Sequence, residues 1–221
     1  MRVGSRSTRL LCALVTLAAG TAAYAVPTYD FICIVGSSPV GEDQFQVQVL
    51  ADPDPAKVVF HFMNTGPLAS VITDVYFDDG ALLALVQINN GPGVLFTSPA
   101  TPSDLPGGHD IGFETTDSFS ADSKPPSVIS EGAGPGEWVE IVFTLLPGKT
   151  YADVLEQLAA SQLLIGVRGQ SVTGASGNSY VNNPNPLPNG GGPVPAPGAL
   201  LLGVLGVGCV RGIRRRRILG R

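Results

Sequence analysis

Apolar and polar residues alternate along several short stretches of the chain, which is the period of a β-strand with one buried face. Phe45, Val47 and Val49 alternate with glutamines and give the clearest example. Gly, Pro, Asn and Asp, which are typical of turns, separate these stretches. Further strand-like runs are Tyr29–Val35, Lys57–Asn64, Trp138–Leu146 and Leu163–Gln170. The pattern predicts an all-β fold, an antiparallel β-sandwich of the jelly-roll or Ig-like kind.

Turn chemistry predicts one hairpin. Ser70–Phe77 and Ala81–Ile88 read as strands, and Asp78-Asp79-Gly80 lies between them. Asp-Gly readily takes the positive φ angles of a tight turn, so we expect the two strands to pair.

A single short helix interrupts the strands. Thr150 is placed to cap Tyr151–Ser161, and Asp153 occupies the third helical position. The pairing of these two residues predicts a helix N-terminus. We expect this helix to close one end of the sandwich.

The N-terminus has the features of a secretory signal peptide. Three arginines precede the apolar run Leu10–Ala19, which is too short to span a bilayer. Ala23 and Ala25 supply the small residues that signal peptidase needs at its two subsites. We therefore predict a signal peptide over 1–25.

The C-terminus carries an ordered set of three features after a Gly-, Asn- and Pro-rich stretch, which predicts a flexible linker over 173–193. Next come a proline motif, an apolar segment predicted to be transmembrane over 198–213, and an arginine cluster at 214–217. The motif is Val194, Pro195, Ala196 and Pro197, and the basic residues are Arg211, Arg214, Arg215, Arg216 and Arg217. As a helix, the fully apolar part Gly198–Val210 would be only about 20 Å long, whereas the hydrocarbon core of a bilayer is about 30 Å thick. This length suits a segment that spans the membrane only until it is processed. The trailing arginines place the tail in the cytoplasm and the body outside.

These terminal residues resemble the PEP-CTERM sorting domain, which consists of a Pro-x-Pro motif, a small-residue-rich transmembrane segment and terminal arginines. The resemblance implies recognition by an exosortase, a membrane-embedded cysteine transpeptidase that cuts near the proline motif. It also implies that residues 194–217 form the sorting signal. Ala196 departs from the family motif, which has Glu there, so the exosortase subtype stays open. An ordinary tail anchor is the alternative.

Charge is divided unevenly along the chain. The segment between the two targeting ends holds all 18 acidic residues but only four basic ones, giving a net charge of −14 against −5 for the whole chain. Such a body repels phosphate backbones, so nucleic acid and anionic membrane surfaces are poor partners. The length of 26–172 suits one β-sandwich domain.

Residues suited to catalysis or metal binding are few. Cys33 is the one cysteine between the targeting ends, and we expect a buried structural thiol. His61 lies in a strand-like run and His109 in a loop, and no nucleophile motif accompanies them. Asp74, Asp78 and Asp79 are candidate Ca²⁺ ligands around the hairpin, although the same residues suit a turn without metal. No catalytic residue, metal site or cofactor is assigned.

The sequence favours an exported protein of the bacterial envelope or exopolysaccharide matrix with a non-enzymatic, structural or adhesive role. Signal peptidase and exosortase are its expected processing partners, and the C-terminal helix its membrane contact before processing. Extracellular polysaccharide is a further expected partner, which enters through the family resemblance. The alternative is a carbohydrate-binding module or a polysaccharide-active enzyme at the cell surface. Exposed aromatics on a concave face, or two facing carboxylates, would favour this alternative.

Overall fold

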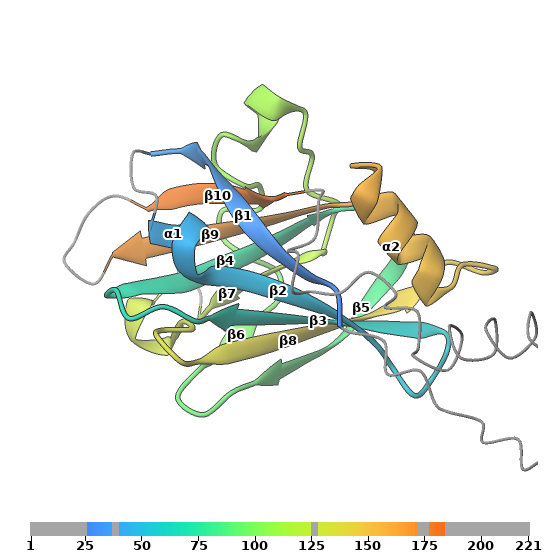
Figure 1. The fold of residues 1–221 in the computed structure, drawn as a ribbon, viewed down its shortest axis with the longest axis horizontal. Coiled ribbons are helices and arrows are strands. Elements are labelled where there is room, and N and C mark those ends of the chain that lie inside the picture. Colours follow the sequence, from blue (N-terminus) through green and yellow to red (C-terminus); the bar gives the residue numbers. More distant parts are fainter. Residues whose placement is uncertain (1–25, 37–39, 125–127, 172–176, 184–221) are drawn as a thin grey trace, which may run out of the picture. The chain divides into compact units, whose positions relative to one another are not determined.

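Ten β-strands and a few short helices form the framework of the chain in the computed structural model, which describes residues 26–36, 40–124, 128–171 and 177–183 (Figure 1). All of these residues belong to one compact unit, Tyr24–Pro193. A second unit comprises residues 1–23 and 194–221, which are not among the described residues. The strands are β1 Thr28–Val35, β2 Phe45–Ala51, β3 Lys57–Asn64, β4 Ser70–Asp78, β5 Leu82–Asn90, β6 Phe96–Thr97, β7 Ser120–Ser123, β8 Trp138–Leu145, β9 Leu164–Ser171 and β10 Asn178–Asn182. The helices are α1 Val40–Gln44, α2 Tyr151–Ala159 and the 3₁₀ turns η1 Gly108–Ile111 and η2 Ile129–Glu131.

Antiparallel pairing joins the strands in the order β5-β8-β3-β2-β1-β10-β9-β4-β7-β6. Strand β1 pairs with β2 at Thr28–Asp30 and with β10 from Phe31 onward, so it is shared by two halves of the sheet. We name the half β5-β8-β3-β2-β1 sheet A and the half β1-β10-β9-β4-β7-β6 sheet B.

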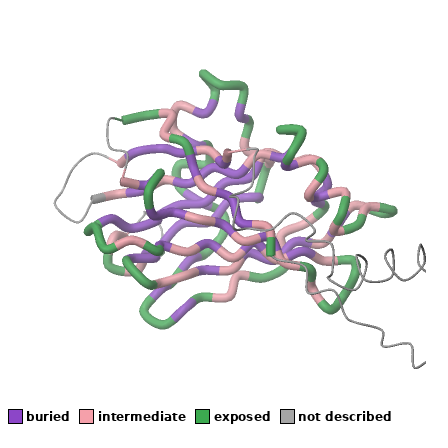
Figure 2. Tube along the Cα trace, viewed as in Figure 1, coloured by how far each residue is buried: buried purple, intermediate pink, exposed green. Residues whose placement is uncertain are grey.

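Sheets A and B pack against each other through their apolar faces, and buried segments run along the strands of both (Figure 2). Phe77 on β4 lies 4.9 Å from Phe60 and 6.0 Å from Phe62, both on β3, between ring centroids. It also lies 4.7 Å from Phe143 on β8. Because β4 belongs to sheet B while β3 and β8 belong to sheet A, these contacts cross the core. The prediction of a mainly antiparallel β fold with few helices is confirmed.

Local patterns located several elements correctly. Phe45, Val47 and Val49 of β2 and the alternating face of β8 are buried as expected. Helix α2 begins at the predicted cap: Asp153 Oδ2 accepts the Thr150 N–H at 2.8 Å, and Thr150 Oγ1 accepts the Asp153 N–H at 3.4 Å. The hydrogen bonds from Thr150 lower the pKa of Asp153, as expected for a carboxylate that caps a helix.

The predicted hairpin over 70–88 is wrong in its pairing, although both strands form. Strand β4 pairs with β7 and β9 in sheet B, whereas β5 pairs with β8 in sheet A. The connection therefore crosses from one sheet to the other. Gly80 is needed there for close approach rather than for a turn angle, because an added Cβ would lie 2.8 Å from the Gln162 carbonyl oxygen.

The flexible linker predicted over 173–193 is also wrong in part. Strand β10 lies within that range, between β1 and β9, and its Tyr180 is buried. The domain therefore extends past the predicted boundary at 172, to at least Asn183, whose N–H donates to the Asp30 carbonyl.

Candidate functional site

A row of polar side chains crosses the outer face of sheet A on four neighbouring strands. In direct register, Gln48 on β2 faces His61 on β3, His61 faces Glu140 on β8, and Glu140 faces Asn89 on β5. Residues next to them in sequence point to the core, so these four point outward and are partly exposed. We call Gln48, His61, Glu140 and Asn89 the polar row. With strands about 4.8 Å apart, it is about 14 Å long.

The carboxylate of Glu140 is held from both sides within the polar row. Its Oε1 lies 3.1 Å from His61 Nδ1, and its Oε2 accepts a hydrogen bond from Asn89 Nδ2 at 3.0 Å. Gln87 in turn donates to the side-chain oxygen of Asn89. The side chains of His61 and Glu140 keep 18% and 24% exposure, so a ligand in solution reaches them. Since an ionised carboxylate can only accept, Nδ1 of His61 is the donor in this contact.

An aromatic surface borders the polar row. The Trp138 ring lies 5.2 Å from the His61 ring at an interplanar angle of 31°. It also rests on Gly91, where an added Cβ would lie 3.2 Å from two indole carbons. Among the described residues, Trp138 and Tyr151 are the aromatic Phe, Tyr and Trp side chains that are not buried. Trp138 thus places carbon surface next to hydrogen-bonding groups.

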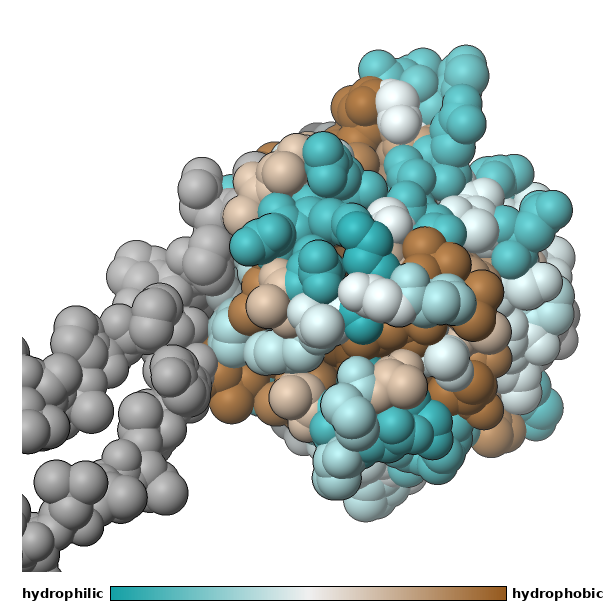
Figure 3. All heavy atoms as spheres, turned by 90° about the vertical axis from the view of Figure 1, so that its right-hand side faces the viewer, coloured by the Kyte–Doolittle hydropathy of each residue, from teal (hydrophilic) through white to brown (hydrophobic). Residues whose placement is uncertain are grey.

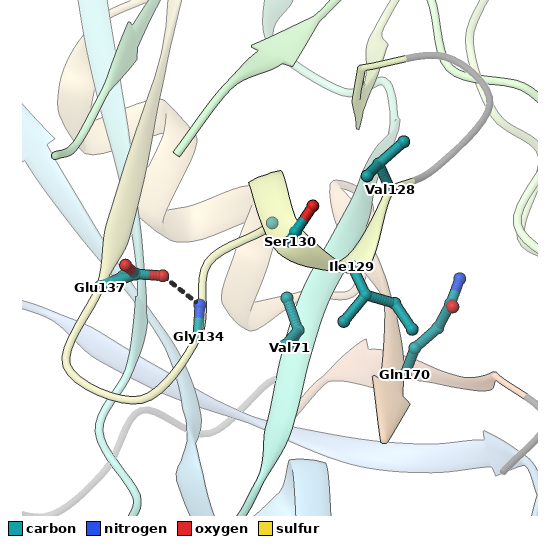
Figure 4. A pocket seen from close by; sticks show the side chains of 8 residues that line it. Val71, Val128, Ile129, Ser130, Gly134, Glu137 and Gln170 are labelled. Atoms are coloured by element: carbon teal, nitrogen blue, oxygen red, sulfur yellow. Dashed lines mark hydrogen bonds between the residues drawn. The ribbon is translucent and has the colours of Figure 1, made fainter. Parts of the chain in front are cut away.

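A pocket of about 720 Å³ opens between η2 and the strands β4 and β9 (Figure 4). Two of its polar side chains are engaged within the protein. Glu137 Oε2 accepts the Gly134 N–H at 2.8 Å, and Gln170 Nε2 donates to Thr73 Oγ1 at 3.4 Å. The lining residues are Val71, Val128, Ile129, Ser130, Gly132, Gly134, Glu137 and Gln170. Such a lining provides a concave, mainly apolar surface and few side chains that could take part in catalysis.

The three candidate calcium ligands serve separate roles. Asp74 is fully buried on β4. Asp79 Oδ1 accepts the Leu82 N–H at 3.0 Å and fastens the crossing between the sheets, whereas Asp78 Oδ2 accepts the Glu114 N–H at 3.1 Å and ties the end of β4 to a distant loop. Burial raises the pKa of both carboxyls. In the described part of the chain, no three His, Cys, Asp or Glu side chains are grouped to hold a metal ion.

Two other residues singled out in the sequence are more exposed than catalytic or structural roles require. His109 is exposed in η1. Cys33 was expected to be buried, but it is only half-buried at the edge of the core, where the pairing of β1 with β10 shifts register. Burial, followed by the nearby Glu42, raises the pKa of its thiol, which favours the protonated form.

The predicted processing residues lie outside the described residues. These are Ala23 and Ala25, the motif Val194–Pro197, Arg211 and the cluster Arg214–Arg217. The transmembrane segment predicted over 198–213 lies there too. Within the described ranges, no helix combines the length and the apolar character needed to cross a membrane.

Sequence reasoning placed His61 on a half-exposed strand but missed its partners. Alternation alone puts Gln48, His61 and Glu140 on polar faces. It does not reveal that they face one another, because His61 and Glu140 are 79 residues apart in sequence.

Comparisons with known proteins identify no relative of this chain. No family model matches the sequence, and neither a curated protein nor a solved structure matches it.

Proposed function

We propose that this protein is an exported, non-enzymatic adhesion protein of the bacterial envelope or exopolysaccharide matrix, which holds polysaccharide on the outer face of sheet A. The observation that carries the proposal is the polar row beside Trp138. It presents amide, imidazole and carboxylate groups on an open face, with aromatic carbon surface at its border. The two-layer packing of the sheets supports a sandwich of the Ig-like or jelly-roll kind as its scaffold.

The chemistry of the row suits a neutral, extended sugar chain. Hydroxyl groups both donate and accept, and the row offers acceptors at Glu140 together with amides that do both at Gln48 and Asn89. Strands about 4.8 Å apart repeat these groups at roughly the spacing of sugar units along a chain. The segment between the targeting ends carries 18 acidic against four basic residues, which disfavours an anionic polymer.

Binding without hydrolysis is the favoured activity. Most glycosidases flank the scissile bond with two carboxyl groups. The polar row contains a single carboxylate, Glu140, and both of its oxygens already accept hydrogen bonds from neighbours. The row therefore supports recognition more than acid–base chemistry.

Glu140→Gln tests the site. The substitution replaces the charged acceptor of His61 and Asn89, and we expect binding of the full chain to a neutral glucan to weaken about 10- to 100-fold, the value of one charge-assisted hydrogen bond. Affinity electrophoresis or calorimetry measures this, with a polyuronate as the anionic comparison ligand. Glu156→Gln makes the same charge change on the exposed side of α2 and should bind like the unmodified protein. Equal affinity of the Glu140 and Glu156 variants, or no glucan binding by the unmodified protein, refutes the proposed site.

Delivery to the surface has its own test. We propose that signal peptidase removes 1–25 and that an exosortase cuts near Pro195 and Pro197, releasing or transferring the body. Mass spectrometry of the protein from native cells should find an N-terminus at Val26 and a C-terminus before the arginine cluster. Cells without exosortase should retain an intact tail in the membrane fraction. An intact C-terminus at Arg221 in the mature protein of normal cells contradicts the sorting proposal.

A further inference from the structure

Two buried aspartates and one arginine face one another across sheet B. Asp122 on β7 is the direct partner of Asp74 on β4, and Asp74 is the direct partner of Arg168 on β9. Their sequence neighbours Ala121, Val75 and Val167 belong to the core, so the three charged residues lie on the outer face of sheet B. Asp74 and Asp122 are both 0% exposed.

A long loop covers this acidic pair. We call residues 98–117 the cap; it includes η1 and rises as the light-green segment at the top of Figure 1. Its Thr101 N–H donates to Asp122 Oδ2 at 2.9 Å, and its Pro102 carbonyl accepts from the Tyr76 hydroxyl at 3.2 Å. Leu105 and Phe113 of the cap pack on Tyr76 in a second apolar cluster. The pair therefore lies at the joint between the cap and sheet B.

The charges at this joint do not balance if both acids are ionised. Like charges directly opposite one another on paired strands are destabilising, and burial removes the water that would screen them. Oδ1 of Asp122 is buried and has no hydrogen-bond partner among the described residues. Arg168 adds one positive charge on the strand next to Asp74. This charge compensates one of the two carboxylates and would repel a cation at the same place.

We propose that Asp74 and Asp122 share one proton, and that this proton fastens the cap to sheet B. The proton lies on Asp122, whose O–H satisfies the otherwise unpartnered oxygen, while Asp74 stays ionised beside Arg168. Loss of the proton to hydroxide leaves two facing carboxylates and loosens the cap. The joint is thus a pH-sensitive closure on the face of the body opposite the polar row.

The titratable groups around Asp122 agree with this assignment. Burial raises the pKa of Asp122 most strongly, the hydrogen bond from Thr101 offsets part of this rise, and the Asp74 charge adds to it. Burial and Asp74 also raise the pKa of Tyr76, partly offset by Arg168, so its hydroxyl remains a neutral donor to Asp74 and Pro102. Because the folded protein holds the Asp122 proton more tightly than the unfolded chain, the stabilisation is complete below the ordinary Asp pKa of about 4. It is lost as pH rises through the raised value.

Hydrogen exchange of the full chain at about pH 5.5 and about pH 8 tests the closure, after correction for intrinsic exchange rates. We expect cap amides such as Thr101 to exchange about tenfold faster at the higher pH, because deprotonation of the pair opens the cap more often. Asp122→Asn keeps the shape of the neutral acid and carries no ionisable proton, so its cap protection should not change with pH. Asp110→Asn changes an exposed charge within η1 and should behave like the unmodified protein.

Infrared spectroscopy gives a second readout, and its pH dependence can be measured on the unmodified protein alone. A protonated-carboxyl band should persist at neutral pH and disappear as the pH is raised, and it should be missing in Asp122→Asn. A pH-independent cap in the unmodified protein, or no protonated carboxyl at neutral pH, overturns the proposal. An unchanged pH response in Asp122→Asn does so as well.

Discussion

Phe77→Ala is expected to lower the free energy of unfolding by about 3–5 kcal/mol, a large part of the stability of a domain of this size. The Phe77 ring is fully buried and contacts three rings of sheet A, among them Phe60 and Phe143. Its removal leaves a cavity at the centre of the contact between the sheets, where strands on both sides are fixed by their own hydrogen bonds. Urea denaturation followed by circular dichroism measures the loss.

Phe113→Ala is the matched comparison for this experiment. Phe113 is also nearly completely buried, at 3% exposure, but it belongs to the small cluster beneath the cap. Its removal should loosen the cap while the contact between sheets A and B remains intact, so the loss of stability should be smaller. A greater loss for Phe113→Ala than for Phe77→Ala would mean that the cap, and not the intersheet contact, limits stability.

Several strands and helix α2 were predictable because their signals are local. Alternation located β2 and β8, and the pairing of Thr150 with Asp153 located the start of α2. The hairpin failed because Asp78-Asp79-Gly80 suits a crossing between sheets as well as a turn. Strand β4 is buried on both faces along nearly its whole length, and this burial places it inside sheet B between β7 and β9. A long-range property therefore decided the pairing.

The candidate sites depend on register, which the sequence did not supply. The polar row requires four strands to align so that Glu140 meets both His61 and Asn89. No strand was predicted around Asp122, and its partner Asp74 was considered only as a calcium ligand. Buried acids of this kind break the rule that strands bury apolar residues, so alternation could not reveal them. The sorting signal and the signal peptide stay predictions from the sequence.

A chain that ends at Gly177 is expected not to fold, whereas one that ends at Asn183 is expected to fold like the complete body. Loss of β10 leaves the facing edges of β1 and β9 unpaired and removes Tyr180, which packs edge-on against Phe45 at 5.6 Å. The cost should exceed about 5 kcal/mol, the lower range of whole-domain stability. Circular dichroism and urea denaturation of the two truncated chains measure it.

The comparison between the two truncations separates a strand from a linker. If residues 173–183 only tethered the body, both chains would fold equally well, since neither would lack a core residue.

In the structure, the Asn182 side-chain oxygen accepts the Ile165 N–H at 2.7 Å, so β10 also satisfies a buried backbone donor of β9. A buried donor left without a partner costs about 1–3 kcal/mol. Asn182→Ala in the chain that ends at Asn183 should therefore lower the free energy of unfolding by about 1–3 kcal/mol. The stability of this variant should lie between the stabilities of the two truncated chains. Equal stability of the Gly177 and Asn183 chains would show that sheet B closes without β10.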